Sequence, residues 1–276
     1  MIPDSRLLSF MTHDECYAVH IIEGQKIIKD LALIHDLKGA GFLFYRDCVL
    51  SAIPLISLLK HGETLGFYID SKEPTFAFKI EMSEHGHLRT LLMPESFDEF
   101  PKKVTGTSRL IKIMKNKAPY NSIIELKDID PHKISNQMIK ESYQMDGFVI
   151  LSQDSDQAAL IMKLPRKSWD KEELLPTTTP FESFKKDFES LLPTILAEGK
   201  HSEKEIINTM EKNSFFHLKS KDIAFKCSCT RERMILGLKS LLGQHSVDEL
   251  FEGENSLETK CDYCKTFYQI NKNEVK

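Results

Sequence analysis

The sequence predicts an α+β protein with a strand-rich N-terminal domain that contains packed helices, a helical linker and a small C-terminal cysteine module. Three observations lead to this fold class. Short segments of alternating hydrophobicity fill roughly the first 165 residues. Phenylalanines then recur at helical spacing after residue 180, and four of the six cysteines form two close pairs after residue 225.

Strands are predicted in the N-terminal domain where apolar and polar residues alternate over short stretches. The stretches are residues 17–22, 66–70, 75–82, 87–93, 147–151 and 158–165. Residues 108–114 and 121–127 flank a turn that contains proline, so we expect them to pair as a hairpin. Residues 49–62 are apolar around most of a helical circumference, which predicts a buried helix, and residues 132–145 form a second candidate helix.

The linker is predicted from a change of composition after Pro165. Residues 165–184 hold three prolines and a threonine run, which indicates a domain boundary. A helical stripe follows in Phe181, Phe184, Phe188, Leu191 and Ile195, although Pro193 interrupts it at a cost of roughly 3 kcal/mol. The helix after it begins at Ser202 and Glu205, which have capping-box spacing. We therefore expect domains at 1–175 and 224–276, joined by a marginally stable linker at 176–223.

Composition excludes several classes of function. A net charge of −4 and a pI near 6.2 argue against a nucleic-acid binder driven by bulk charge. The apolar run near the N-terminus is too short for a secretory signal, and no window approaches eighteen uncharged apolar residues. We expect a soluble cytoplasmic protein without nucleic-acid or membrane partners. Dinucleotide, Walker and nucleophile-elbow motifs are absent from the sequence, so we do not expect an enzyme.

The cysteine module covers the last fifty or so residues. Cys227 and Cys229 form a Cys-x-Cys pair, and Cys261 and Cys264 form a Cys-x-x-Cys pair. In a reducing cytosol such thiols are more often metal ligands or redox-active groups than permanent disulfides. A module of this size buries little apolar surface, whereas structural zinc contributes an apparent ~10–16 kcal/mol in small peptides. We therefore predict that all four thiolates bind one Zn²⁺.

Helices and strands are expected to frame these cysteines. Thr230 is a plausible N-cap for a helix over 231–242, and Ser246 and Glu249 have capping-box spacing before a stop at Gly253. Residues 256–260 and 266–270 flank the second pair as strands entering and leaving a knuckle.

Spacing alone leaves alternatives open and favours a static zinc ribbon, which would bind a protein partner or nucleic acid. A nucleic-acid binder needs a basic surface, yet residues 246–258 are acidic. A thioredoxin-like thiol-disulfide oxidoreductase is a third reading, but residues 261–264 lack the surrounding βαβ unit.

The module resembles that of a known family. The segment "FKCSCTRERM", the apolar residues of the intervening helices, and "CDYC" followed by "FYQI" are similar to the zinc module of the bacterial redox-regulated heat-shock chaperone, the thirty-three-kilodalton heat-shock protein. The similarity is specific over residues 224–270 and looser but collinear elsewhere. The N-terminal domain is divergent, because it lacks the Arg-Gly pair that the family usually carries in an early strand.

This resemblance implies an ATP-independent holdase that is activated by oxidation. Cys227, Cys229, Cys261 and Cys264 would bind Zn²⁺ in the reduced state. Oxidation would join Cys227 to Cys229 and Cys261 to Cys264 and expel the metal. The linker would then undock and expose apolar surface for unfolding client proteins. The resemblance also allows a homodimer after oxidation.

The remaining candidate residues are assigned structural roles. Isolated cysteines are usually small buried hydrophobes, so Cys16 and Cys48 are expected in the core. His85 and His87 are interpreted as part of a polar turn, because further metal ligands are not apparent from the sequence. The sequence fixes no geometry for acid–base chemistry among His13, Asp14, His61 and Glu63.

Overall fold

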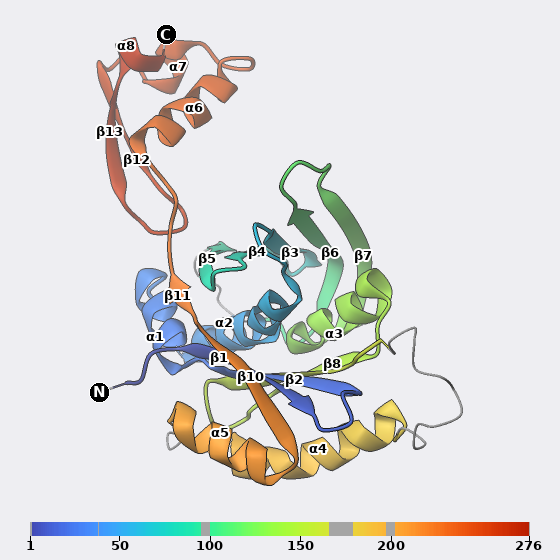
Figure 1. The fold of residues 1–276 in the computed structure, drawn as a ribbon. Helices are drawn as coiled ribbons and strands as arrows, with labels where there is room; N and C mark the ends of the chain where they lie inside the picture. The colour runs from blue at the N-terminus through green and yellow to red at the C-terminus, as the bar shows by residue number, and fades with distance from the viewer. Residues whose placement is uncertain (1, 38, 95–99, 166–178, 197–201, 276) are drawn as a thin grey trace. The chain divides into compact units, whose positions relative to one another are not determined.

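The structure, a computed structural model, describes residues 2–37, 39–94, 100–165, 179–196 and 202–275. The chain divides into two compact units, Met1–Phe225 and Lys226–Lys276 (Figure 1). Most of the segment predicted as a domain boundary, including the expected border at residue 175, lies outside the described residues.

The first unit contains a five-stranded antiparallel sheet in the order β10-β1-β2-β9-β8. Its strands are β1 (Arg6–Thr12), β2 (Tyr17–Glu23), β8 (Gly147–Leu151), β9 (Gln157–Lys163) and β10 (Phe215–Asp222). Every residue of β2 is buried, because both faces of the sheet are covered. Ile22 packs into one core cluster, whereas Val19 and Ile21 pack into another.

A second sheet has six strands in the order β11-β5-β4-β3-β6-β7, antiparallel except where β11 pairs with β5. The strands are β3 (Thr64–Glu73), β4 (Thr75–Ser83), β5 (His87–Met93), β6 (Val104–Ile113), β7 (Tyr120–Ile129) and β11 (Ala224–Phe225). The strands predicted at 66–70, 75–82 and 87–93 are confirmed. The hairpin predicted from 108–114 and 121–127 is also confirmed, as β6 and β7.

Helices pack in the main core, which joins residues from both sheets (Figure 1). They are α1 (Gln25–Ile34), α2 (Gly39–Ala52), η1 (Ile53–Leu58), η2 (Pro131–Lys133), α3 (Ile134–Met138) and η3 (Ile139–Tyr143). The prediction of one helix over 49–62 is wrong in extent. The α-helix ends at Ala52, because Pro54 lacks an amide N–H, and the chain continues as a 3-10 helix.

The segment Gly41–Leu58 is long and apolar enough to cross a membrane by length and composition alone. In the structure 72% of that segment is buried inside the protein. Val49, Ile53 and Ile56 are fully buried in the main core. The segment is therefore the central core helix of the first unit.

The linker helices are α4 (Phe181–Ile195) and α5 (Glu203–Lys212), and they cover the face of the first sheet opposite α1 and α2 (Figure 1). Helix α4 continues through Pro193, and the capping box of Ser202 and Glu205 at α5 is confirmed. The chain then turns at Ser214, where φ is +67°, and enters β10, which pairs with β1. The sequence analysis missed this strand because little of it is buried.

The second unit has a two-stranded sheet and three helices. They are α6 (Arg231–Leu241), α7 (Val247–Leu250), β12 (Ser256–Lys260), β13 (Phe267–Asn271) and α8 (Lys272–Val275). The predicted caps are confirmed, since Thr230 and Ser246 accept hydrogen bonds from the backbone N–H groups of Arg233 and Glu249.

Candidate metal centre

The four cysteine sulfurs of the second unit lie together. Cys227 and Cys229 precede α6, and Cys261 and Cys264 lie in the turn between β12 and β13. Their Sγ atoms all lie within 4.8 Å of one another. The Cys227 and Cys261 sulfurs are 3.8 Å apart, and those of Cys229 and Cys264 are 3.3 Å apart. The fold thus brings together two motifs that are far apart in the sequence.

The Cys-x-x-Cys motif is shaped by a tight turn at the end of the hairpin. The N–H of Cys261 donates to the carbonyl oxygen of Thr266 at 2.9 Å, and the N–H of Lys265 donates to the carbonyl of Cys261 at 2.8 Å. Lys265 adopts a left-handed conformation with φ of +61°, which reverses the chain after the second cysteine. This turn holds the sulfurs of Cys261 and Cys264 close to those of Cys227 and Cys229.

The Cys-x-Cys motif is fixed by the start of α6. Thr230 caps the helix, and Arg233 Nη1 donates to the carbonyl and hydroxyl oxygens of Ser228 at 2.8 and 2.6 Å. Ser228 lies between the two cysteines, so these hydrogen bonds hold the backbone segment that carries both sulfurs. The first residues of the helix thereby position the tighter motif.

Two hydroxyl groups contact the sulfurs. The Tyr268 hydroxyl lies 3.1 Å from the Cys229 sulfur, and the Thr266 hydroxyl lies 3.2 Å from the Cys264 sulfur. The sequence analysis did not identify these residues. Their only sequence signal is a hydroxyl side chain two and four residues after Cys264. Such contacts orient metal ligands and tune their basicity.

The thiols differ in their ionisation without a metal. Burial raises the pKa of Cys229 to about 12 and also raises the pKa of Cys261. Burial also acts to raise the pKa of Cys264, but hydrogen bonds from the side chain and backbone of Thr266 and from the neighbouring thiols lower it to about 6. Cys264 is therefore the first of these three to become a thiolate, the form that binds metal.

The four sulfurs are suited to a tetrahedral ion. Sulfurs placed 2.3 Å from a zinc ion at the corners of a tetrahedron are about 3.8 Å apart. The separations of 3.3 and 3.8 Å fit such a site after small side-chain movements. An all-sulfur set with no open position is typical of structural zinc and unlike catalytic zinc sites. The cluster could therefore hold a metal ion.

The apolar core beside the cluster is small. Among the described residues of the second unit, its core cluster has three fully buried members, Phe251, Ile270 and Val275, with partly buried neighbours around them. A paired contact supports this core, because the Arg231 guanidinium donates to both carboxylate oxygens of Glu274 at 2.6 and 2.5 Å. These hydrogen bonds from Arg231 lower the pKa of Glu274 to about 2. This bond joins the start of α6 to the C-terminal helix.

The remaining cysteines lie in the first unit. Cys48 is fully buried, as predicted, and burial raises its pKa strongly. The prediction for Cys16 is wrong, because this residue is only half-buried in a turn, where its sulfur contacts the Asp14 carbonyl oxygen at 3.3 Å. The half-burial follows from its place at the β1–β2 connection, outside both sheets' packed faces.

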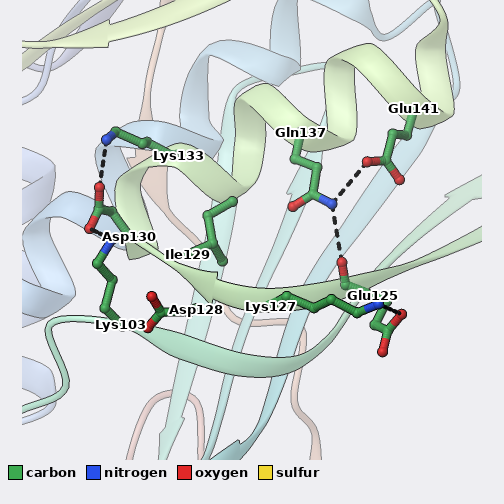
Figure 2. A pocket seen from close by; sticks show the side chains of 9 residues that line it. All are labelled: Lys103, Glu125, Lys127, Asp128, Ile129, Asp130, Lys133, Gln137 and Glu141. Atoms are coloured by element: carbon green, nitrogen blue, oxygen red, sulfur yellow. Dashed lines mark hydrogen bonds and ion pairs between the residues drawn. The ribbon is translucent and has the colours of Figure 1, made fainter.

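A surface hollow beside β7 and α3 is a weaker candidate (Figure 2). Its charged groups mainly bind one another. Asp130 lies 3.0 Å from Lys103 and 2.6 Å from Lys133, and Gln137 donates to Glu141 at 2.9 Å. Hydrogen bonds from Lys133 and Lys103 lower the pKa of Asp130 to about 2. The hollow is therefore a network of surface ion pairs, and the cysteine cluster is the stronger candidate.

Known proteins resemble this chain in sequence. The sequence model described as Hsp33 protein matches residues 5–271. A 33 kDa chaperonin of Thermosipho melanesiensis is 18% identical, with 93% of this chain and 92% of that protein covered. A 33 kDa chaperonin of Lactococcus lactis is 25% identical, but the alignment covers 60% of this chain and 58% of that protein.

A solved structure has the same fold. The crystal structure of the 33 kDa chaperonin of Thermotoga maritima matches with a TM-score of 0.74 at 14% identity, covering 99% of this chain and 97% of that one. The fold agrees over nearly the whole chain, and the family's sequence model extends across both units and all four clustered cysteines. The chain belongs to the Hsp33 family, a family of chaperones.

Proposed function

We propose that this protein is a redox-regulated, ATP-independent holdase that binds unfolding proteins after its cysteine cluster is oxidised. In the reduced state Cys227, Cys229, Cys261 and Cys264 hold one Zn²⁺. The observation that carries the proposal is the meeting of four sulfurs within 4.8 Å in a unit with only a small apolar core. Homologues named as chaperonins support the same class of function.

Bound zinc contributes most of the free energy that keeps the second unit folded. Structural zinc supplies an apparent ~10–16 kcal/mol in small zinc-binding peptides. Full burial of three apolar side chains supplies less, at roughly 1.5–3 kcal/mol each and thus about 4.5–9 kcal/mol together. The unit therefore unfolds when the metal leaves, and metal retention depends on four thiolates that oxidants attack.

Peroxide is the oxidant class in the proposed switch. Two thiolates, one hydrogen peroxide and two protons give one disulfide and two molecules of water. Two such reactions join Cys227 to Cys229 and Cys261 to Cys264. A pair within one motif requires only local chain movement, so both bonds remain accessible after the metal is lost and the motifs separate. A disulfide offers no thiolate ligands, which prevents zinc from returning.

The linker is the element that responds. Helices α4 and α5 cover one face of the first sheet through Phe188, Ile206 and Met210, all almost fully buried. Tyr17 stacks on Phe184 with ring centroids 3.9 Å apart. Undocking exposes this apolar face together with the sheet residues beneath it: Leu8, Phe10, Val19, Ile21, Ala159 and Ile161. A contiguous apolar surface of this kind binds unfolding client proteins.

The chain connects the linker directly to the cluster. Strand β10 follows α5, and β11 leads into Cys227 after a single residue. Unfolding of the second unit therefore frees the chain from Lys226 onward, directly after β11. The proposed regions are an N-terminal chaperone core to residue 175, the linker over 176–223 and the redox-sensitive module from 224 to 276, working in a reducing compartment such as the cytoplasm.

The test follows aggregation of a chemically unfolded client by light scattering, with reduced protein and with peroxide-treated protein. A chromogenic chelator reports zinc release in the same samples. We expect oxidised protein alone to suppress aggregation, in parallel with release of one zinc per chain. Retention of zinc under peroxide would instead indicate a static zinc ribbon. Zinc release without suppression of aggregation would separate the redox-sensitive module from chaperone function.

A further inference from the structure

Two histidines and a glutamate of the first unit meet where β3 begins and β4 ends. Strands β3 and β4 pair with Thr64 opposite Ser83, so the residues just before β3 lie beside those just after β4. The N–H of Glu84 donates to the carbonyl oxygen of Glu63 at 3.1 Å and joins the two loops. This pairing brings His61 to Glu84 and His85.

Both imidazoles face the same carboxylate oxygen. His61 Nδ1 lies 3.1 Å from Glu84 Oε1, and His85 Nε2 lies 3.2 Å from the same atom. The Gly62 N–H donates to that oxygen at 3.4 Å, and the Glu84 side chain is only 15% exposed. The carboxylate is therefore anchored, whereas the rings are 94% and 65% exposed and free to adjust.

We propose that His61, Glu84 and His85 form a binding site for a first-row divalent metal ion, with Zn²⁺ as the favoured occupant. Imidazole nitrogen with carboxylate oxygen suits zinc, and each binds it at about 2.0–2.2 Å. Neighbouring ligands at that distance in a tetrahedral site lie roughly 3.3–3.6 Å apart. The observed nitrogen-to-oxygen separations of 3.1 and 3.2 Å are close to this spacing.

Binding requires only a small local change. Each facing ring nitrogen lies within 3.2 Å of the Glu84 carboxylate, and for metal binding it must be unprotonated, with any proton on the other nitrogen of the ring. His87 begins β5 with its ring centroid 6.3 Å from that of His85, and it could supply a further imidazole. Water completes the coordination where His87 does not reach.

One nearby charge opposes the cation. The ammonium group of Lys221 donates a hydrogen bond to the backbone carbonyl of Glu84. Its positive charge lies beside the site and lowers the affinity for a divalent ion. We therefore expect binding that is weaker than at a cluster of four thiolates, and reversible by dilution or by a mild chelator.

The test titrates Zn²⁺ by calorimetry into the reduced full chain, already loaded with one zinc per chain. We expect one further ion to bind. The double substitution His61→Ala and His85→Ala should weaken this step at least tenfold, and Glu84→Gln should also weaken it. The two substituted rings are exposed, so their loss should leave folding intact, as circular dichroism would verify.

The matched control removes two other exposed histidines, by His13→Ala and His245→Ala, and should retain the second ion at full affinity. Absence of a second ion in the wild-type chain would overturn the proposal. Equal weakening in the control and test variants would overturn it too, because binding would then be spread over exposed histidines generally. The assay starts from the zinc-loaded chain of the proposed function but does not depend on chaperone activity or on oxidation.

Discussion

The first unit buries more than forty apolar side chains in two clusters, whereas the core cluster of the described second unit buries three. The first unit can fold on apolar burial, which does not depend on thiolates. The second gathers four sulfurs in place of a large core. Loss of a metal from the four sulfurs would therefore remove a larger share of the stabilisation of the second unit than of the first.

The largest expected effect comes from breaking the cluster. Cys261→Ser removes one sulfur at a nearly fully buried position and should forfeit much of the ~10 kcal/mol or more that zinc supplies. We expect loss of zinc, rapid hydrogen exchange in β12 and β13 and weaker protection in α4 and α5, with β2 and β9 unchanged. Cys16→Ser is the matched control and should keep its zinc. Normal zinc content in Cys261→Ser would contradict the ligand assignment.

The second effect loosens the linker directly. Phe188→Ala removes a side chain that is 1% exposed between α4 and the first sheet, a change that costs about 3–5 kcal/mol in packed cores. We expect the reduced variant to be cleaved faster by protease between residues 181 and 212 and to suppress client aggregation without oxidant. Leu33→Ala, at a position 70% exposed, should do neither. Cleavage at the wild-type rate in Phe188→Ala would count against a docked linker.

The third effect is a pH dependence confined to the first unit. Burial, with smaller contributions from Lys219 and Lys221, lowers the pKa of His20 to about 4. A folded-state pKa below the ordinary value means that the unfolded chain binds the proton more readily. Stability is therefore complete above about pH 6.5 and falls by roughly 3 kcal/mol as the pH drops to 4.

Urea denaturation monitored at β2 amides would measure this dependence. His20→Gln should flatten the pH profile between 6.5 and 4, because the buried ring that contacts Ser9 Oγ at 2.9 Å is then gone. His217→Gln in the same unit should leave the profile unchanged. Identical slopes in wild type and His20→Gln would show that other groups account for the acid sensitivity.

The smallest effect concerns a contact to the cluster. Tyr268→Phe removes the hydroxyl that lies 3.1 Å from the Cys229 sulfur. Contacts of this kind change metal affinity by roughly tenfold at the low end of their range. We expect faster zinc release to a chelator and to peroxide, with the fold intact. Tyr120→Phe removes a hydroxyl from the first unit and should release zinc at the wild-type rate.

Local signals predicted much of the fold. Alternation identified β4 and β5 almost to the residue, and helix caps at Thr230 and Ser246 were readable because capping depends on neighbours a few residues apart. β10 was missed, since its place beside β1 depends on residues some 200 positions earlier and only Phe215 within it is buried. Pairing with a strand so far away in the sequence produced no local pattern from which β10 could be predicted.

The residues of the candidate sites also differ in whether local sequence signals predict them. The spacing of the four cysteines predicted one metal site, because tetrahedral zinc binds four ligands and close cysteine pairs commonly supply them. The contact of Tyr268 with Cys229 and the salt bridge of Arg231 with Glu274 depend on how α6 lies against β13 and α8. His61 and Glu84 meet only through the register of β3 and β4. Both strands were predicted, but their register, which brings these two residues together, was not.

Hydrogen exchange measured by mass spectrometry on the reduced and the peroxide-treated full chain tests most directly whether the linker responds to the cysteine cluster. We expect oxidation to remove protection from residues 226–275 and then from α4 and α5, while β2 and β9 in the interior of the first sheet stay protected. Unchanged protection in α4 and α5 after complete zinc loss would contradict it, because the linker would then not respond to the cluster.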